Sequence, residues 1–302
     1  MALGAEEPSS NVRRYAVDLD TFIVIVFCLI DDRLDGERIR QRGPKPRLSD
    51  SEVLTIEVVG EFLGIDTDQG LYAYFRRNYR EWFPALNTVH RTTFCRQAAN
   101  LWGAKEKLWK HLLDRIRFDP ELSLVDSFPI EVCRFARAYR CRLLAEESAF
   151  GHDEMAKQTF YGLRAHLRVS WPGVICAVSL APADVHDLHV AGKLLEGTEG
   201  WVLGDRNYHS LNLAERLSDR GLRLLTPYKS LKKEKRPWPR FLVQKRRRIE
   251  TVIAQLVGRY KARKVWARDR WHLCSRWLRK VLSHTMAVFM CQRAGLSPLR
   301  FS

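Results

Sequence analysis

The chain has 302 residues, of which 46% are hydrophobic and 28% are charged, so it is expected to be globular and soluble, with two or three domains and a sizeable core. Its net charge of +16 is concentrated: residues 223–280 hold 20 Lys+Arg against 3 Asp+Glu, whereas residues 1–222 have a net charge of −3. Such a segment, with tryptophans between its cations, is typical of a surface that binds a polyanion; a solvated helix face is the alternative.

Cysteine spacing and hydropathy exclude several classes of protein. The seven cysteines are scattered and none forms a C-x-x-C pair, which argues against a zinc site or a disulfide framework and fits a reducing cytoplasm. The apolar run Thr21–Ile30 has acidic flanks and is too short to span a bilayer. We therefore expect one buried helix there, no signal peptide and no membrane association.

Residues 1–118 are predicted to form an all-helical N-terminal domain that binds DNA. Ser49 and Glu52 match a capping box, and Gly64 can end the helix that it opens. A later helix, capped by Asn87 or Thr88, has an apolar stripe on one side. Its other side carries polar residues suited to reading bases and phosphates in a helix-turn-helix, among them Arg96 and Gln97. Any surface helix also has a polar face, so both interpretations stay open.

Residues 119–302 show the pattern of an α/β domain. Leu122–Val125 is a short apolar strand that ends on Asp126. The strictly alternating stretch 163–170 and the stretch 174–180 predict a strand hairpin. A helix, the strand Trp201–Leu203, a second helix and a last strand over 222–226 follow. The order predicts a mixed sheet flanked by helices.

Two acids, Asp126 and Asp205, each follow an apolar strand. An antiparallel meander followed by right-handed crossovers would place these two strands side by side, about 4.8 Å apart. The two carboxylates would then repel each other unless a cation lay between them, which suggests a divalent metal site. An Asp after a strand is also a common turn former or helix cap.

A third acid, Glu250, lies at the rim of an amphipathic helix whose apolar stripe runs from Ile249 to Tyr260. A helix packed on the sheet through this stripe could direct Glu250 toward the two aspartates. Arg246 and Arg247 lie on the same side of the helix, so a surface Glu in intrahelical salt bridges is the alternative.

Further cations and polar groups are candidates for contacts with phosphates. Arg164 and His166 lie on the polar side of their strand, where solvent exposure is the alternative. His186 can be a metal ligand or part of a helix-capping turn. The remaining candidates are the pair after Asp205, a Pro-broken basic linker and two arginines of the Glu250 helix: Arg206, Tyr208, Lys232, Lys233, Lys235, Arg236, Arg246 and Arg247.

Asp126, Asp205 and Glu250, in this order and spacing, resemble the acidic triad of the DDE transposases of bacterial insertion sequences. The runs VDSFPIEVCRFARAYR, AFGHD, FYGLRAHL and KRRRIETVIAQL resemble the insertion sequence 982 family in particular. The resemblance covers roughly residues 45–290. Relatives often carry a Tyr and an Arg before the Glu and a Lys after it; here Val243, Arg246 and Val257 occupy those positions, so no catalytic Lys is carried over.

The resemblance implies a ribonuclease H-like catalytic domain and Mg²⁺-dependent DNA cleavage and strand transfer. Two Mg²⁺ ions, replaceable by Mn²⁺, can clamp the attacking and leaving oxygens of a phosphodiester. Asp126 would bridge both ions, and Asp205 and Glu250 would each hold one. Double-stranded DNA is the expected partner, both as transposon ends and as target. A homodimer in the bacterial cytoplasm, associated with the nucleoid, is also expected. No glycine-rich phosphate loop is apparent, so no nucleotide cofactor is expected.

Two other functions fit part of the pattern. A protein derived from a transposase could bind DNA without catalysis, although the intact acids argue against this. A metal-dependent nuclease would hydrolyse DNA without strand transfer.

Overall fold

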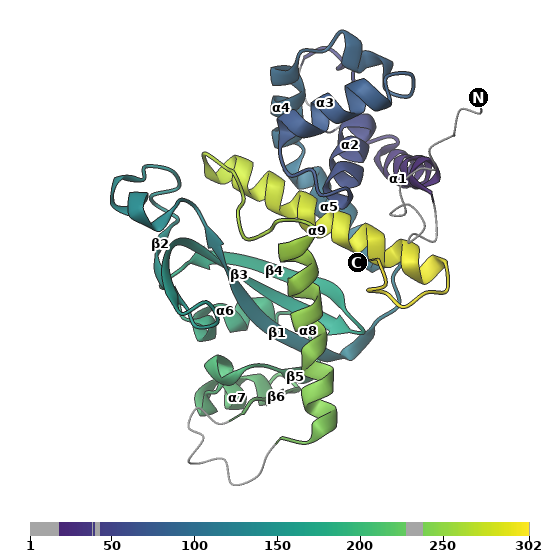
Figure 1. Ribbon diagram of the computed structural model, residues 1–302. Coiled ribbons are helices and arrows are strands. Elements are labelled where there is room, and N and C mark those ends of the chain that lie inside the picture. The colour runs from purple at the N-terminus through teal and green to yellow at the C-terminus, as the bar shows by residue number, and fades with distance from the viewer. Residues whose placement is uncertain (1–17, 38, 40–42, 228–237, 302) are drawn as a thin grey trace, which may run out of the picture.

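The computed structural model describes residues 18–37, 39, 43–227 and 238–301. A group of helices lies above a mixed sheet, and the two long C-terminal helices connect these parts (Figure 1). In the described ranges, no helix is long and apolar enough to cross a membrane.

The N-terminal helices follow local capping signals. They are α1 (Leu19–Leu34), α2 (Asp50–Phe62), α3 (Asp68–Asn78), α4 (Arg91–Asn100) and α5 (Trp102–Leu113), with a 3-10 turn at Pro84–Asn87. The expected capping box is present, because Ser49 and Glu52 exchange side chain-to-backbone hydrogen bonds. The cap of α4 was predicted wrongly. It is His90, because Asn87 belongs to the 3-10 turn and Thr88 follows that turn directly.

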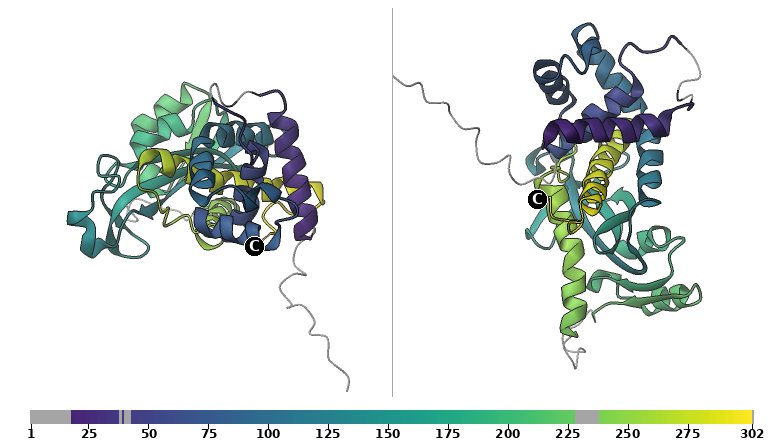
Figure 2. Two further views of the ribbon diagram at one scale, coloured as in Figure 1. Left: turned by 90° about the horizontal axis from the view of Figure 1, so that it is seen from above. Right: turned by 90° about the vertical axis from the view of Figure 1, so that its right-hand side faces the viewer.

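The last helix, α9 (Arg270–Arg293), completes this helical part. It packs on α2, α4 and α5 and touches β4 of the sheet, and it lies between the N-terminal helices and the sheet (Figures 1 and 2). Its buried Arg279 donates to Glu57, Glu61 and Asp68, and Lys280 donates to Glu61. The predicted boundary at residue 118 therefore separates α9 in sequence from the helices that it packs against.

The sheet contains β1 (Asp119–Glu131), β2 (Ala149–Asp153), β3 (Gln158–Trp171), β4 (Val174–Pro182), β5 (Gly200–Leu203) and β6 (Leu222–Leu225). Strand β3 pairs antiparallel with β1, β2 and β4, whereas β5 pairs parallel with both β1 and β6. The path β4-β3-β1-β5-β6 is that of a ribonuclease H-like sheet, as the sequence predicted.

Helices cover both faces of this sheet. Val125 of β1 packs with Ala191 of α6 (Asp187–Leu194) and with Leu213 of α7 (Leu211–Ser218). Leu124, on the opposite face because side chains alternate along a strand, belongs to the cluster that contains Ile249 of α8 (Arg240–Gly258). This arrangement brings α8, and Glu250 with it, over the face of β1 to which Asp126 belongs.

Candidate catalytic site

The pairing of β1 with β5 brings Asp126 and Asp205 to the same level of the sheet. These strands run parallel, and Leu124 lies opposite Leu203. Each aspartate is two residues beyond its member of this pair, and neighbouring strands are about 4.8 Å apart. The expected juxtaposition of the two carboxylates is therefore present.

Asp126 is not at the end of its strand, contrary to the prediction. Strand β1 continues to Glu131 and remains paired with β3, while its pairing with β5 ends at Leu124. Beyond Leu124, the described strands pair with β1 on one side only, through β3, and a strand edge without a partner strand can accept a proline. Asp126 consequently lies within a strand whose other side is open at the level of Asp205.

The two aspartates are half-buried, and both have a raised pKa. Burial and, after it, the charge of Asp205 raise the pKa of Asp126 to about 7. Burial also raises the pKa of Asp205, although that carboxylate accepts a hydrogen bond of 3.0 Å from the backbone N–H of Asn207. A carboxyl whose pKa is raised by the charge of a neighbouring carboxylate gains from a cation between the two.

A third carboxylate, Asp187, lies beside this pair from the other face of the sheet. It is the first residue of α6, is 5% exposed and accepts a hydrogen bond of 3.1 Å from the Ser127 hydroxyl. Burial raises its pKa, and the charge of Asp205 adds to this shift. Asp187 does not cap this helix. His186 is the cap instead, with its ring nitrogen accepting from the Leu188 N–H.

Two arginines face the acidic group. Arg164, which donates 2.9 Å to the His152 carbonyl, and Arg246 of α8 both act to lower the pKa of Asp205. Arg246 acts on the Asp126 carboxyl in the same direction. The site thus combines clustered carboxylates with two cations that can meet a phosphate.

Glu250 forms an ion pair with Arg246 of the same helix. Its carboxylate is 48% exposed and accepts from Arg246 at 2.8 Å, which is the intrahelical salt bridge considered as the alternative. In the part of the chain that the structure describes, no three His, Cys, Asp or Glu side chains are close enough to hold one metal ion. The assignment of Glu250 as a ligand stays a prediction.

Two of the expected phosphate contacts are buried, and those predictions were wrong. His166 is fully buried, and burial followed by the charge of Arg164 lowers its pKa to about 4. Tyr208 is also fully buried, in the cluster under α6 and α7. The alternation of β3 indicated a solvent-facing side, but β3 is a central strand and α6 covers that side.

The two candidates for base or phosphate contacts in a helix-turn-helix, Arg96 and Gln97, differ in their exposure to solvent. Arg96 on α4 is exposed, whereas Gln97 is 5% exposed and its amide donates to the Leu48 carbonyl and to Asp50. Gln97 was therefore assigned wrongly, because its donor group is used inside the helical part.

The other basic candidates differ in accessibility. Arg206 is half-buried and Arg247 is exposed. The four linker cations, Lys232, Lys233, Lys235 and Arg236, lie outside the described residues.

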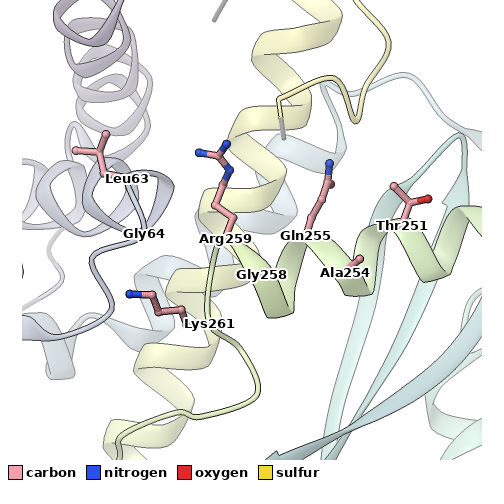
Figure 3. Close-up of a pocket in the computed structure, with 8 residues that line it drawn as sticks. All are labelled: Leu63, Gly64, Thr251, Ala254, Gln255, Gly258, Arg259 and Lys261. Atoms are coloured by element: carbon pink, nitrogen blue, oxygen red, sulfur yellow. The ribbon is translucent and has the colours of Figure 1, made fainter. Parts of the chain in front are cut away.

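A pocket between the end of α2 and α8 does not include the aspartates (Figure 3). Arg259, which lines it, donates to the carbonyls of Phe62 and Phe301 and so ties the end of α8 to the helical part. Arg246 and Glu250 lie nearer the middle of α8, so this anchor is at the C-terminal end of the helix and not at the acidic site.

Residues 119–265 match a known family described as Transposase DDE domain. This stretch is therefore similar to the catalytic domain of DDE transposases, the class to which the acidic site had pointed. No curated protein matched the chain.

Among solved structures, the chain is similar to the piggyBac transposase in a synaptic complex with hairpin DNA. The identity is 11% and the TM-score is 0.49, over 97% of this chain and 80% of the other. The assignment of the fold rests on the strand order and not on this distant likeness.

Proposed function

We propose that the protein is a DNA transposase that binds the ends of its insertion sequence, cleaves phosphodiester bonds there and joins the 3′-hydroxyl ends to target DNA. The observation that carries this proposal is the level placement of Asp126 and Asp205 on the parallel strands β1 and β5. The similarity of residues 119–265 to transposase DDE domains supports it.

The donor set fits a hard divalent cation such as Mg²⁺, or Mn²⁺ in its place. Two half-buried carboxylates offer oxygen ligands only, and their raised pKa values reflect burial and repulsion that a cation would relieve. Asp126 and Asp205 would hold the ions, two in the full site, with Glu250 as the third ligand. When bound, the ions supply positive charge to the attacking and leaving oxygens.

Glu250 must change partner to act in this way. Its carboxylate is bound to Arg246, and the same arginine faces Asp126 and Asp205. We propose that Arg246 turns toward a DNA phosphate in the complex, which frees Glu250 to face the aspartates. Arg164 lies across the site and would bind a neighbouring phosphate.

The chemistry is an exchange of ester oxygens at phosphorus. Cleavage adds water across a P–O bond and leaves a free 3′-hydroxyl on the transposon end. In strand transfer that hydroxyl oxygen forms a new bond to a target phosphorus, and a target 3′-hydroxyl leaves. The protein would act as a homodimer on nucleoid DNA in a bacterial cytoplasm.

Incubation of the protein with DNA that carries the ends of its element and with a supercoiled target tests the proposal. We expect 3′-hydroxyl ends and joined products in Mg²⁺, and neither with Asp126→Asn or Asp205→Asn. Cleavage without joined products would point to a hydrolytic nuclease. Binding of the ends without any cleavage would point to a non-catalytic DNA-binding protein.

A further inference from the structure

The chain between β1 and β3, residues 132–157, projects from the edge of the sheet (Figures 1 and 2). We call it the β1–β3 protrusion. It contains the 3-10 helix Phe135–Arg140 and the strand β2. The function proposed above does not use it.

Aromatic side chains gather on this protrusion without being covered. The ring of Phe150 lies 6.2 Å from Phe135, 5.2 Å from Tyr139 and 5.1 Å from Tyr161 of β3. Phe135 is 46% exposed, Tyr139 is 83% exposed and Phe150 is 39% exposed. We call these three residues the aromatic platform. Large aromatic surface left in water in one place is typical of a binding site.

The charge around the platform is positive. Arg134, Arg137, Arg140 and Arg142 are all exposed, and in the described part of the chain none of them is in a salt bridge. The next acids along the chain, Glu146 and Glu147, line a separate cavity together with Trp102 and Trp109. Exposed arginines interleaved with exposed rings fit a strand of nucleic acid, whose phosphates and bases alternate in the same way.

The platform lies on the same face of the sheet as the candidate catalytic Asp126. Side chains alternate along a strand, so Asp126 and Ile130 share a face. Ile130 lies opposite Leu163, and Tyr161, two residues earlier on β3, faces the same way. Phe150 lies opposite Tyr161. Phe128 and Ile130, between them on this face, are buried, so DNA that contacts both Asp126 and the platform would pass beside the covered part of the sheet.

We infer that the aromatic platform binds an unpaired stretch of DNA strand, with bases stacked on Phe135 and Tyr139 and phosphates held by the surrounding arginines. This inference rests on the proposed function, which brings DNA to this face. Val132, where the protrusion begins, is six residue steps beyond Asp126. At roughly 3.3 Å per residue this is about 20 Å, or about six nucleotide steps of duplex. If two copies of this chain paired through the protrusion, the four arginines of one copy would face the four arginines of the other. Repulsion between them disfavours such a contact.

The first test measures the binding of the full chain to two fluorescent probes of mixed sequence, a 20-nucleotide single strand and the matching duplex. The variant Phe135→Ala/Tyr139→Ala should lose about tenfold in affinity for the single strand, as expected for one or two lost stacking contacts. Its affinity for the duplex should stay within about twofold of wild type. Met155→Ala is the matched control, because Met155 is 95% exposed on the same protrusion but outside the platform. Tyr139→Phe keeps the ring and should bind as wild type does.

Three outcomes would overturn the inference. These are an unchanged affinity of the double variant for the single strand, an equal loss for both probes, or a change of oligomeric state in sedimentation without a change in DNA binding. Thermal melting of each variant excludes unfolding as the cause. Because this assay needs no cleavage, a protein that binds the single strand through the platform but never cuts DNA would contradict only the proposed function.

Discussion

Among single residues, Arg246 has the most consequential surroundings. It pairs with Glu250 at 2.8 Å and also stabilises the ionised forms of Asp126 and Asp205. One cation is thus shared by all three acids of the proposed triad. In the function proposed above, a metal ion would compete with Arg246 for these carboxylates, so metal binding and the release of Arg246 should occur together.

Glu250→Gln tests the role of the third acid. The amide keeps the shape of the side chain but loses the charge, and we expect cleavage to fall by at least about a hundredfold. Binding of the transposon ends should stay near wild type, because one charge among many phosphate contacts is changed. Gel assays of cleavage and of end binding measure the two effects.

The matched control for this change is Glu215→Gln on α7, an exposed Glu outside the site. Wild-type cleavage by Glu250→Gln would remove Glu250 from the triad and make Asp187 the next candidate. If Glu215→Gln cleaves DNA as the wild type does, the loss of cleavage in Glu250→Gln can be attributed to the position of Glu250.

A buried histidine should make stability depend on pH. Burial lowers the pKa of His284, which is packed beside Tyr260 and Phe301, to about 3. The folded pKa is below the unfolded value of 6.5, so between pH 6.5 and about 3 the unfolded chain binds the extra proton. The resulting stability is present above pH 6.5 and is lost as the pH falls, by about 1.4 kcal/mol per pH unit.

Urea unfolding of wild type and His284→Leu between pH 7 and 4 measures this contribution. His166 acts in the same direction, and the raised pKa of Asp126 acts in the opposite one. The difference between the two proteins isolates His284. We expect the variant to show the shallower loss of stability on acidification, and parallel pH curves would refute the assignment.

At the scale of secondary-structure elements, the pairing of β1 with β5 creates the candidate site, and it was predictable from the sequence. Two short apolar runs, each followed by an acid, identified both strands, and the right-handed crossover rule placed them side by side. The surroundings of β3 were not predictable in this way. Its alternation marks two faces, but only the packing of α6 decides that the polar face is covered, and this turned His166 from an expected surface group into a buried one.

The acid Asp187 shows a further limit of sequence reasoning. An acid at a helix start is common because it favours the helix dipole, so nothing local distinguishes Asp187 from an ordinary first-turn residue. Its proximity to Asp205 follows from how α6 packs on the sheet, which is a tertiary fact.

The β1–β5 site should be stabilised by divalent cations. Asp126 and Asp205 repel each other without a cation, and a ligand that binds only the folded state stabilises it by mass action. We expect Mg²⁺ or Mn²⁺ to raise the melting temperature of the wild type, and Asp126→Asn and Asp205→Asn each to reduce the rise. Differential scanning calorimetry with and without the ion measures it. An equal rise in wild type and both variants would mean that the ion binds elsewhere.

At the scale of the whole molecule, the basic segment serves two purposes. The +17 of residues 223–280 suggested a surface for polyanion. Three of its cations, Arg276, Arg279 and Lys280, instead form ion pairs with Asp68 and Glu61 inside the helical part. Composition alone cannot distinguish cations in buried ion pairs from cations on the surface, because the acidic partners of these three residues are about two hundred residues away in sequence.

Loss of Arg279 should be severely destabilising. Replacing it with Met leaves Glu57, Glu61 and Asp68 without this buried partner, and breaking a buried ion pair typically costs about 3–5 kcal/mol. Arg270→Met on the exposed start of the same helix should cost about 0.5 kcal/mol or less. Chemical denaturation of both variants gives the comparison, and similar losses would show that the internal ion pairs contribute little.

The position of α9 at the end of the chain also determines when the helical part can complete its folding during synthesis. Glu61 and Lys280 are 219 residues apart, and translation at about 5–20 residues per second separates their emergence by on the order of ten to forty seconds. For that interval Glu61 of α2 lacks Arg279 and Lys280, although α5 with Lys105, the other partner of Glu57, has been made. Co-translational folding of the N-terminal helices should therefore stall until the last helix leaves the ribosome. Any chain terminated before α9 should be a substrate for proteases and chaperones, not a free DNA-binding fragment.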